Sequence, residues 1–133
     1  MEFSNPEARY VSSNPKSTSH YFRLLPVPTV PHLTLQEHEI KERIIVVGDV
    51  HGCYHELVEL LDRCKYNPEN TQVILVGDLV NKGPHSDEVI KFARKNKLLC
   101  IRGNHDHDAL VYGLKIHPNS RPAYLSYLDN LEE

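Results

Sequence analysis

The chain has 133 residues, 25% of them charged and 40% hydrophobic, a balance typical of one globular domain rather than of a disordered protein. Its formal net charge is −3 and its pI is about 6.3, so no basic excess indicates nucleic acid or an anionic membrane as a partner. The sequence shows neither an apolar stretch long enough to span a membrane nor the apolar core of a secretory signal near its start.

The N-terminal part differs in composition from the rest. Residues 1–40 hold most of the prolines, many serines and no sustained periodicity, which predicts a disordered or extended leader. We expect a folded domain over residues 41–133, truncated at its C-terminus. Three cysteines, at positions 53, 64 and 100, have no CxxC spacing, which favours reduced thiols and a cytoplasmic location.

Strand and helix patterns alternate from residue 43 onward. The predicted elements are a strand over Arg43–Val50, a helix over Cys53–Cys64, a strand over Gln72–Leu79, a helix from Asp87 capped by Ser86, a strand over Leu98–Arg102, and a short helix over Asp106–Tyr112. Right-handed crossovers make this β-α-β-α-β order a parallel α/β sheet. The first strand is apolar nearly throughout, as in a strand buried on both faces. Two helices on one face of the sheet would nevertheless leave the other face uncovered.

Each predicted strand runs into a polar, glycine-containing loop: GDVHG after the first, GDLVNKGP after the second and RGNHD after the third. Ligands of parallel α/β sheets bind outside the carboxyl ends of the strands. A single Gly-Asp after a strand is usually a turn with a capping carboxylate, but three such loops in order indicate a shared site. The site would collect Asp49, His51, Asp78, Asn104, His105 and Asp106.

Carboxylate, imidazole and amide donors of this kind suit a divalent ion such as Mn, Fe or Zn. One carboxylate can bridge two ions, which together polarise a phosphoryl oxygen and generate hydroxide near neutral pH. Asp78, on the middle loop, is the natural bridge. Asp49 and His51 alternate on an extended segment and could reach one ion, and Asn104 could reach the second, leaving His105 for proton transfer.

The three motifs resemble GDxHG, GDxVDRG and GNH[ED] of the calcineurin-like metallophosphoesterases, in the branch with phosphoprotein-phosphatase-type signatures. The resemblance covers about residues 43–112. The second motif is most similar to that of the symmetrical diadenosine tetraphosphatase (ApaH-like) group. The family fold is an αββα sandwich, so the resemblance implies that this chain holds its N-terminal, parallel-sheet half.

The resemblance also implies roles at the matching positions. Asp49 and His51 would bind the first metal ion, Asp78 would bridge, and Asn104 would bind the second ion. His105 would be the general acid that protonates the leaving oxygen while a metal-activated hydroxide attacks phosphorus in line.

Two residues depart from the phosphoprotein phosphatase pattern. Asn81 stands where those enzymes carry an aspartate that pairs with the catalytic histidine; Asn can accept a hydrogen bond but brings no negative charge. Lys82 replaces an arginine and would hold phosphate oxygens as a point charge rather than a bidentate fork. Arg102 is a candidate phosphate ligand as well, although a structural role is favoured for it. These departures favour a dinucleoside polyphosphate or polyphosphate substrate over a phosphoprotein.

The family's second metal ion takes two further histidines from downstream loops. After His105 the chain offers only His107 and His117, for which solvated loop positions are expected, so the second site is incomplete. His55 and His85 are expected at the surface.

Three functions remain open. The first is a metal-dependent phosphoesterase with two divalent ions that cleaves phosphoanhydride or phosphomonoester bonds. The second is a serine/threonine phosphoprotein phosphatase. The third is a catalytically incomplete short form that binds a metal ion or a partner without turnover.

Overall fold

The structure is a computed structural model that describes residues 32–115 and 119–131. Residues 1–31 of the predicted leader lie outside the described residues. The rest of that segment is mostly exposed and carries one short 3-10 helix, η2 (Glu37–Glu39).

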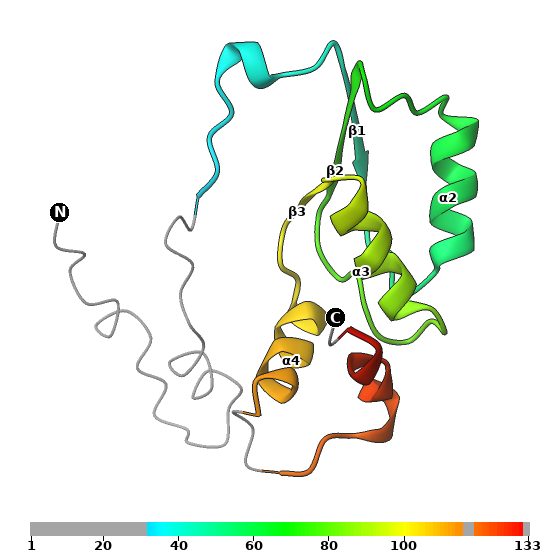
Figure 1. The fold of residues 1–133 in the computed structure, drawn as a ribbon, viewed down its shortest axis with the longest axis vertical. Helices are drawn as coiled ribbons and strands as arrows, with labels where there is room; N and C mark the ends of the chain where they lie inside the picture. Colours follow the sequence, from blue (N-terminus) through cyan, green and yellow to red (C-terminus); the bar gives the residue numbers. More distant parts are fainter. Residues whose placement is uncertain (1–31, 116–118, 132–133) are drawn as a thin grey trace, which may run out of the picture.

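A three-stranded parallel sheet forms the centre of the fold (Figure 1). Its strands, in spatial order, are β1 (Arg43–Val47), β2 (Thr71–Leu75) and β3 (Leu99–Cys100), and the connections are helices α2 (Tyr54–Arg63) and α3 (Ser86–Lys95). This arrangement confirms the predicted β-α-β-α-β order and the parallel sheet. Because both crossovers run in the same direction along the sheet and both are right-handed, both helices lie on one face.

The hydrophobic core lies between that face and the two helices. It contains Leu57 and Leu61 of α2, Val89 of α3, and Val73 and Leu75 of β2. Each is 3% exposed or less, as expected for apolar faces at helical and strand spacing.

The opposite face of the sheet is open to solvent in the described part of the chain. Ile44 is 52% exposed and Val46 is 62% exposed, whereas Ile45 and Val47 alternate with them and pack against the core. The expectation that β1 is buried on both faces is therefore wrong for this chain, and the expected uncovered face is confirmed.

The second strand ends at Leu75 rather than Leu79. Val76 makes one more sheet contact by donating to the Val47 carbonyl at 3.0 Å. Gly77 (φ 109°) and Asp78 (φ 50°) then turn the chain out of the sheet, in a backbone region that glycine enters without steric cost. This turn delivers Asp78 to the carboxyl end of the strands.

Two further helices lie at that end of the sheet, α4 (Asn104–Gly113) and the 3-10 helix η3 (Ala123–Leu131) (Figure 1). Helix α4 begins two positions before the predicted Asp106, so Asn104 and His105 form its first turn. The sequence pattern did not predict η3, which contacts α3 and α4 and buries Leu125 completely.

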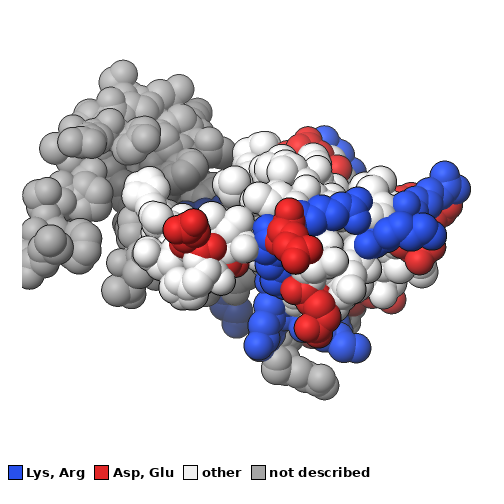
Figure 2. All heavy atoms as spheres, turned by 90° about the horizontal axis from the view of Figure 1, so that it is seen from above, with Lys and Arg blue, Asp and Glu red and all other residues white. Residues whose placement is uncertain are grey.

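The surface and the thiols agree with the composition. Figure 2 shows acidic and basic side chains interspersed on the face seen from above. All three cysteines are free thiols. Within the described ranges, no helix combines the length and the apolar character that crossing a membrane requires.

Candidate metal centre

Backbone hydrogen bonds hold the first two motif loops side by side. The Val50 and His51 amides both donate to the Asp78 carbonyl, at 3.1 and 2.8 Å. In the opposite direction, the Gly83 amide donates to the His51 carbonyl at 2.8 Å. A β-carbon on Gly83 would overlap that carbonyl, so this close approach requires glycine.

The third loop packs on the second through Gly103. A β-carbon at Gly103 would overlap the Asp78 backbone nitrogen and its carboxylate. The Asp106 carboxylate then ties the two loops together, because it accepts from the Gly103 amide and the Leu79 amide, each at 2.8 Å. Asp106 therefore acts as an N-terminal cap of α4 that also positions the loop of Asp78.

The backbone is strained at this rim. Among the described residues, seven non-glycine residues have positive φ. Three of them, Lys65, Lys97 and Lys115, follow helix ends, where a left-handed residue is ordinary. The other four, His51, Asp78, Asn81 and Lys82, lie in the first two motif loops. Such conformations cost about 1–3 kcal/mol each and cluster at functional sites. The hydrogen bonds between the two motif loops hold these residues in their positive-φ conformations.

The His51 ring is oriented as a metal ligand would be. Its Nδ1 lies 3.1 Å from the Val80 carbonyl, which can only accept, so the ring proton sits on Nδ1. The lone pair of Nε2 consequently faces two carboxylates, at 3.6 Å from Asp49 Oδ2 and 3.7 Å from Asp78 Oδ2. A histidine that binds a metal ion usually donates its other ring N–H to a carbonyl or carboxylate in this way, which fixes the tautomer.

Asp78 lies at the centre of the rim. Its side chain is only 13% exposed, and its Oδ1 accepts the His105 backbone amide at 3.0 Å, at the start of α4. One ligand atom from each of His51, Asp78 and His105 can be chosen so that all lie within 4.8 Å of one another. Asp49 is peripheral, with a side chain 64% exposed, and Asn104 is exposed beside His105.

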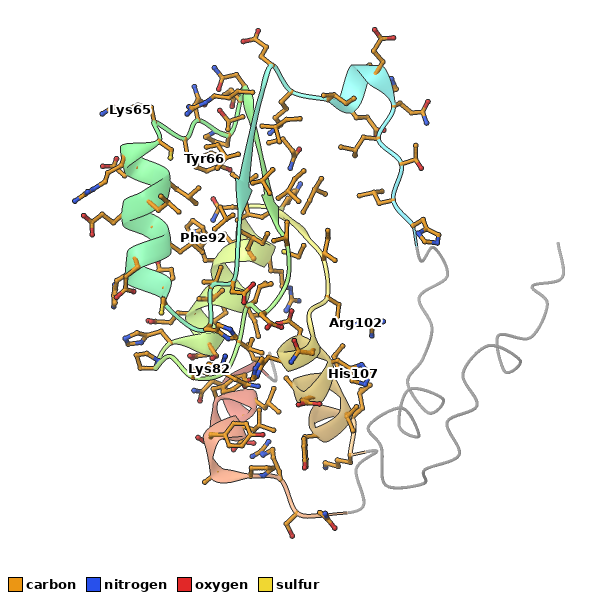
Figure 3. The ribbon with its side chains drawn as sticks, turned by 180° about the vertical axis from the view of Figure 1, so that it is seen from behind. Lys65, Tyr66, Lys82, Phe92, Arg102 and His107 are labelled. Atoms are coloured by element: carbon orange, nitrogen blue, oxygen red, sulfur yellow. The ribbon has the colours of Figure 1, made fainter. Side chains whose placement is uncertain are left out.

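The donor set fits a divalent ion of intermediate hardness, since it combines carboxylates with an imidazole lone pair aimed between them. Lys82 supports this reading: its ammonium nitrogen lies 3.3 Å from His51 Nε2, so a cation already interacts with that lone pair. Arg102, the other candidate phosphate ligand, lies beside His107 and apart from Lys82 (Figure 3).

The Asn81 side chain is buried and its amide is oriented by two contacts. Tyr127 of η3 donates its hydroxyl to Asn81 Oδ1 at 2.8 Å, and Asn81 Nδ2 then faces His105 Nδ1 at 3.4 Å. The sequence expectation was that Asn81 would accept a hydrogen bond; its oxygen does so from Tyr127, and the nitrogen faces the histidine. Burial, then the charge of Asp106 and the neighbouring Tyr124, raise the pKa of Tyr127, which keeps its hydroxyl a donor.

The Asn81 loop also differs from the prediction at Ser86. Ser86 is the first residue of α3 rather than its cap, and His85 occupies the capping position. The Ser86 hydroxyl accepts the Asn81 amide at 3.0 Å, because the loop folds back over the helix start. The serine therefore fixes the Asn81 backbone.

His107 is not the solvated loop histidine that was expected, because it lies in α4 and its side chain is buried. Burial, followed by the Arg102 charge, lowers the pKa of His107, and Asp108 opposes the shift. His117 lies outside the described residues.

Sequence reasoning collected Asp106 at the rim without giving it a role, and it did not assign Tyr127 to the site. Asp106 has a signal, since an acidic residue three positions after Gly103 fits the helix capping pattern. Tyr127 has none, because its contact with Asn81 joins residues 46 positions apart.

A hollow beside the rim does not include these donors in its lining. A cavity of about 800 Å³ is bounded by β3, α4 and η3 and is lined mostly by apolar side chains such as Ile101, Leu110 and Leu128. Its lining lacks His51, Asp78 and His105, so these three donors lie outside the cavity.

Comparison with known proteins agrees with the motif loops. The calcineurin-like phosphoesterase family model matches residues 42–132. The symmetrical bis(5'-nucleosyl)-tetraphosphatase of Erwinia tasmaniensis is 44% identical over 93 residues, which cover 66% of this chain and 34% of that protein. The enzyme of the same name from Aromatoleum aromaticum is 43% identical over 75 residues, which cover 55% of this chain and 26% of that protein.

A solved structure is also similar. The crystal structure of "a putative diadenosine tetraphosphatase" superposes with a TM-score of 0.53 at 32% identity, covering 65% of this chain and 41% of that one. The chain thus spans between a quarter and a third of the length of these two curated relatives. With the family model matching most of its length, the chain belongs to the calcineurin-like phosphoesterase family.

Proposed function

We propose that this chain forms the metal-binding half-site of a phosphoesterase that hydrolyses phosphoanhydride bonds, with dinucleoside polyphosphates or polyphosphate as the favoured substrates. One observation carries the proposal: the His51 Nε2 lone pair faces the Asp49 and Asp78 carboxylates within 3.7 Å. The printed names of the relatives, symmetrical bis(5'-nucleosyl)-tetraphosphatases, support the substrate class.

Four side chains would hold two divalent ions, Mn, Fe or Zn. Asp49 and His51 would hold the first, Asn104 the second, and Asp78 both. Asp78 is suited to that position because its Oδ1 is fixed by the His105 amide, which leaves Oδ2 directed at the rim. Bound ions would polarise a phosphoryl oxygen and supply hydroxide near neutral pH.

His105 would act as the general acid. Its Nδ1 faces the Asn81 amide nitrogen at 3.4 Å, so Nε2 would carry the proton that the imidazolium form transfers. During hydrolysis an oxygen from water bonds to phosphorus, the bond from phosphorus to the leaving oxygen breaks, and the leaving oxygen takes the proton from His105. Lys82 would hold a non-bridging phosphate oxygen as its charge develops.

The Asn81 amide favours an anhydride over a phosphoprotein. With its oxygen taken by Tyr127 and its nitrogen facing His105, it supplies no negative charge to stabilise a protonated imidazole. A serine or threonine alkoxide is a poor leaving group that needs a strong proton donor. A nucleotide phosphate leaves as a stable anion, so a histidine whose protonated form is less strongly stabilised suffices as the acid.

The test is hydrolysis by the chain with added Mn²⁺, comparing diadenosine tetraphosphate, inorganic polyphosphate and a phosphoserine peptide. We expect turnover of the first two to exceed that of the peptide, and symmetrical cleavage of the tetraphosphate to give a single nucleoside diphosphate product. Preferential peptide hydrolysis would instead support the phosphoprotein phosphatase alternative.

Metal binding without turnover is the second candidate. It is favoured by the exposed position of Asp49. Titration with Mn²⁺ alongside the hydrolysis assay separates the two: saturable binding with no hydrolysis of any of the three substrates supports the binding form.

A further inference from the structure

A second group of metal-binding side chains lies outside the rim, where α2 and α3 begin. His55 is the second residue of α2, His85 caps α3, and Glu88 lies in the first turn of α3. The two helix starts are fixed next to each other because the His85 amide donates to the Gly52 carbonyl at 3.0 Å. The fold therefore positions the three side chains together independently of the rim donors.

The three side chains already converge. The rings of His55 and His85 meet edge to face, with centroids 4.8 Å apart, and His85 Nδ1 lies 2.9 Å from Glu88 Oε2. One ligand atom from each residue can be chosen so that all three lie within 4.8 Å of one another. Tetrahedral coordination at bonds of about 2.0–2.1 Å needs ligand atoms about 3.3–3.5 Å apart, which small side-chain rotations would reach.

Glu88 supplies a second observation that points to a cation. Its Oε2 is buried but makes no hydrogen bond of acceptable geometry, despite its short distance to His85. A buried carboxylate oxygen without such a bond is costly unless a cation compensates it. The group remains accessible to an ion, because the His85 and Glu88 side chains are 40% and 45% exposed.

From this arrangement we propose that His55, His85 and Glu88 form a peripheral site for a borderline divalent ion, Zn²⁺ in the first instance. Two imidazoles and one carboxylate are a three-residue zinc set that leaves a fourth position for water. The negative charge of the Glu88 carboxylate offsets the partial positive charge of the helix N-termini, which alone would disfavour a cation.

Binding at this site would tie α2 to α3 at their first turns. The segment immediately before His85 carries Asn81 and Lys82, so the ion would also fix one end of the loop that forms the proposed phosphate contact. The expected consequence is a zinc-dependent gain in stability that does not require the rim ligands.

The experiment uses the chain without a polyhistidine tag and carries Asp78→Asn to disable the rim. We expect this variant to bind one Zn²⁺ by calorimetric titration. Adding His55→Ala or His85→Ala should weaken that binding by at least about tenfold, whereas His38→Ala, at an exposed histidine outside the cluster, should leave it unchanged.

His55→Ala keeps the test decisive if His85→Ala fails to fold, because His55 is exposed and alanine is the best helix former. The proposal is overturned if the Asp78→Asn chain binds no Zn²⁺, or if His55→Ala in that background binds it as tightly as its parent. Ring-proton NMR signals of His55 and His85 that do not move on addition of Zn²⁺ would also overturn it. Loss of Mn²⁺-dependent hydrolysis, by contrast, would count against the rim alone.

Discussion

Asp78→Asn tests the central carboxylate without changing its shape. In the structure Oδ1 accepts the His105 amide at 3.0 Å and Oδ2 lies 3.7 Å from His51 Nε2. The amide can satisfy only one of these demands with its single oxygen. If the oxygen stays with His105, the NH₂ group points toward the position of the ions and repels them.

The magnitude follows from those contacts. A hydrogen bond to a charged acceptor is worth about 1.5–3 kcal/mol, against about 0.5–1.5 kcal/mol for a neutral one, so the metal-free variant should lose roughly 1 kcal/mol. For a domain of this size that lowers Tm by about 4–8 °C. With Mn²⁺ at a hundred times its Kd, the parent chain should gain about 2.7 kcal/mol, and the variant should gain almost none.

Thermal unfolding with and without Mn²⁺ measures both effects and needs no enzymatic turnover. His85→Ala is the matched control, because it removes a ligand of the peripheral cluster and should keep the Mn²⁺-dependent increase. If Asp78→Asn gained as much stability from Mn²⁺ as the parent chain, Asp78 would not be the shared ligand.

Three other predictions can be checked on the same chain. Gly103→Ala should lose about 1–3 kcal/mol of stability and weaken Mn²⁺ binding, because the added β-carbon would overlap Asp78. Gly113→Ala should do neither, because its β-carbon meets no atom closer than 3.7 Å. Equal effects of the two substitutions in chemical denaturation would contradict this prediction. Tyr127→Phe removes the hydroxyl that donates to the buried Asn81 amide beside the proposed general acid. This substitution should lower the free energy of unfolding by about 1–3 kcal/mol and slow hydrolysis. An unchanged free energy of unfolding together with an unchanged rate would refute the role of that contact. The lowered pKa of His107 means that the unfolded chain binds the proton more readily than the folded chain. The free energy of unfolding should therefore fall as pH drops below about 6.5, and His107→Leu should flatten that pH dependence. The same pH dependence in both chains would show that this histidine does not cause it.

Local sequence patterns were enough to predict the sheet and the position of the rim. Apolar strand runs followed by Gly-Asp or Gly-Asn predicted three parallel strands whose loops meet at one edge, and the loops around His51, Asp78 and His105 do meet there. Strand and helix periodicity is local, and the right-handed crossover rule converts it to topology, so no long-range contact had to be known. The same pattern predicted the uncovered sheet face.

The hydrogen-bond role of each polar atom in the site depends on tertiary contacts. The tautomer of His51 depends on the Val80 carbonyl and the orientation of Asn81 depends on Tyr127, contacts that span 29 and 46 residues. The meeting of His55 with His85 likewise depends on how two helix starts are fixed together. Hydrogen-bond direction and side-chain convergence are set by partners that are remote in the chain, and composition and spacing carry no record of them.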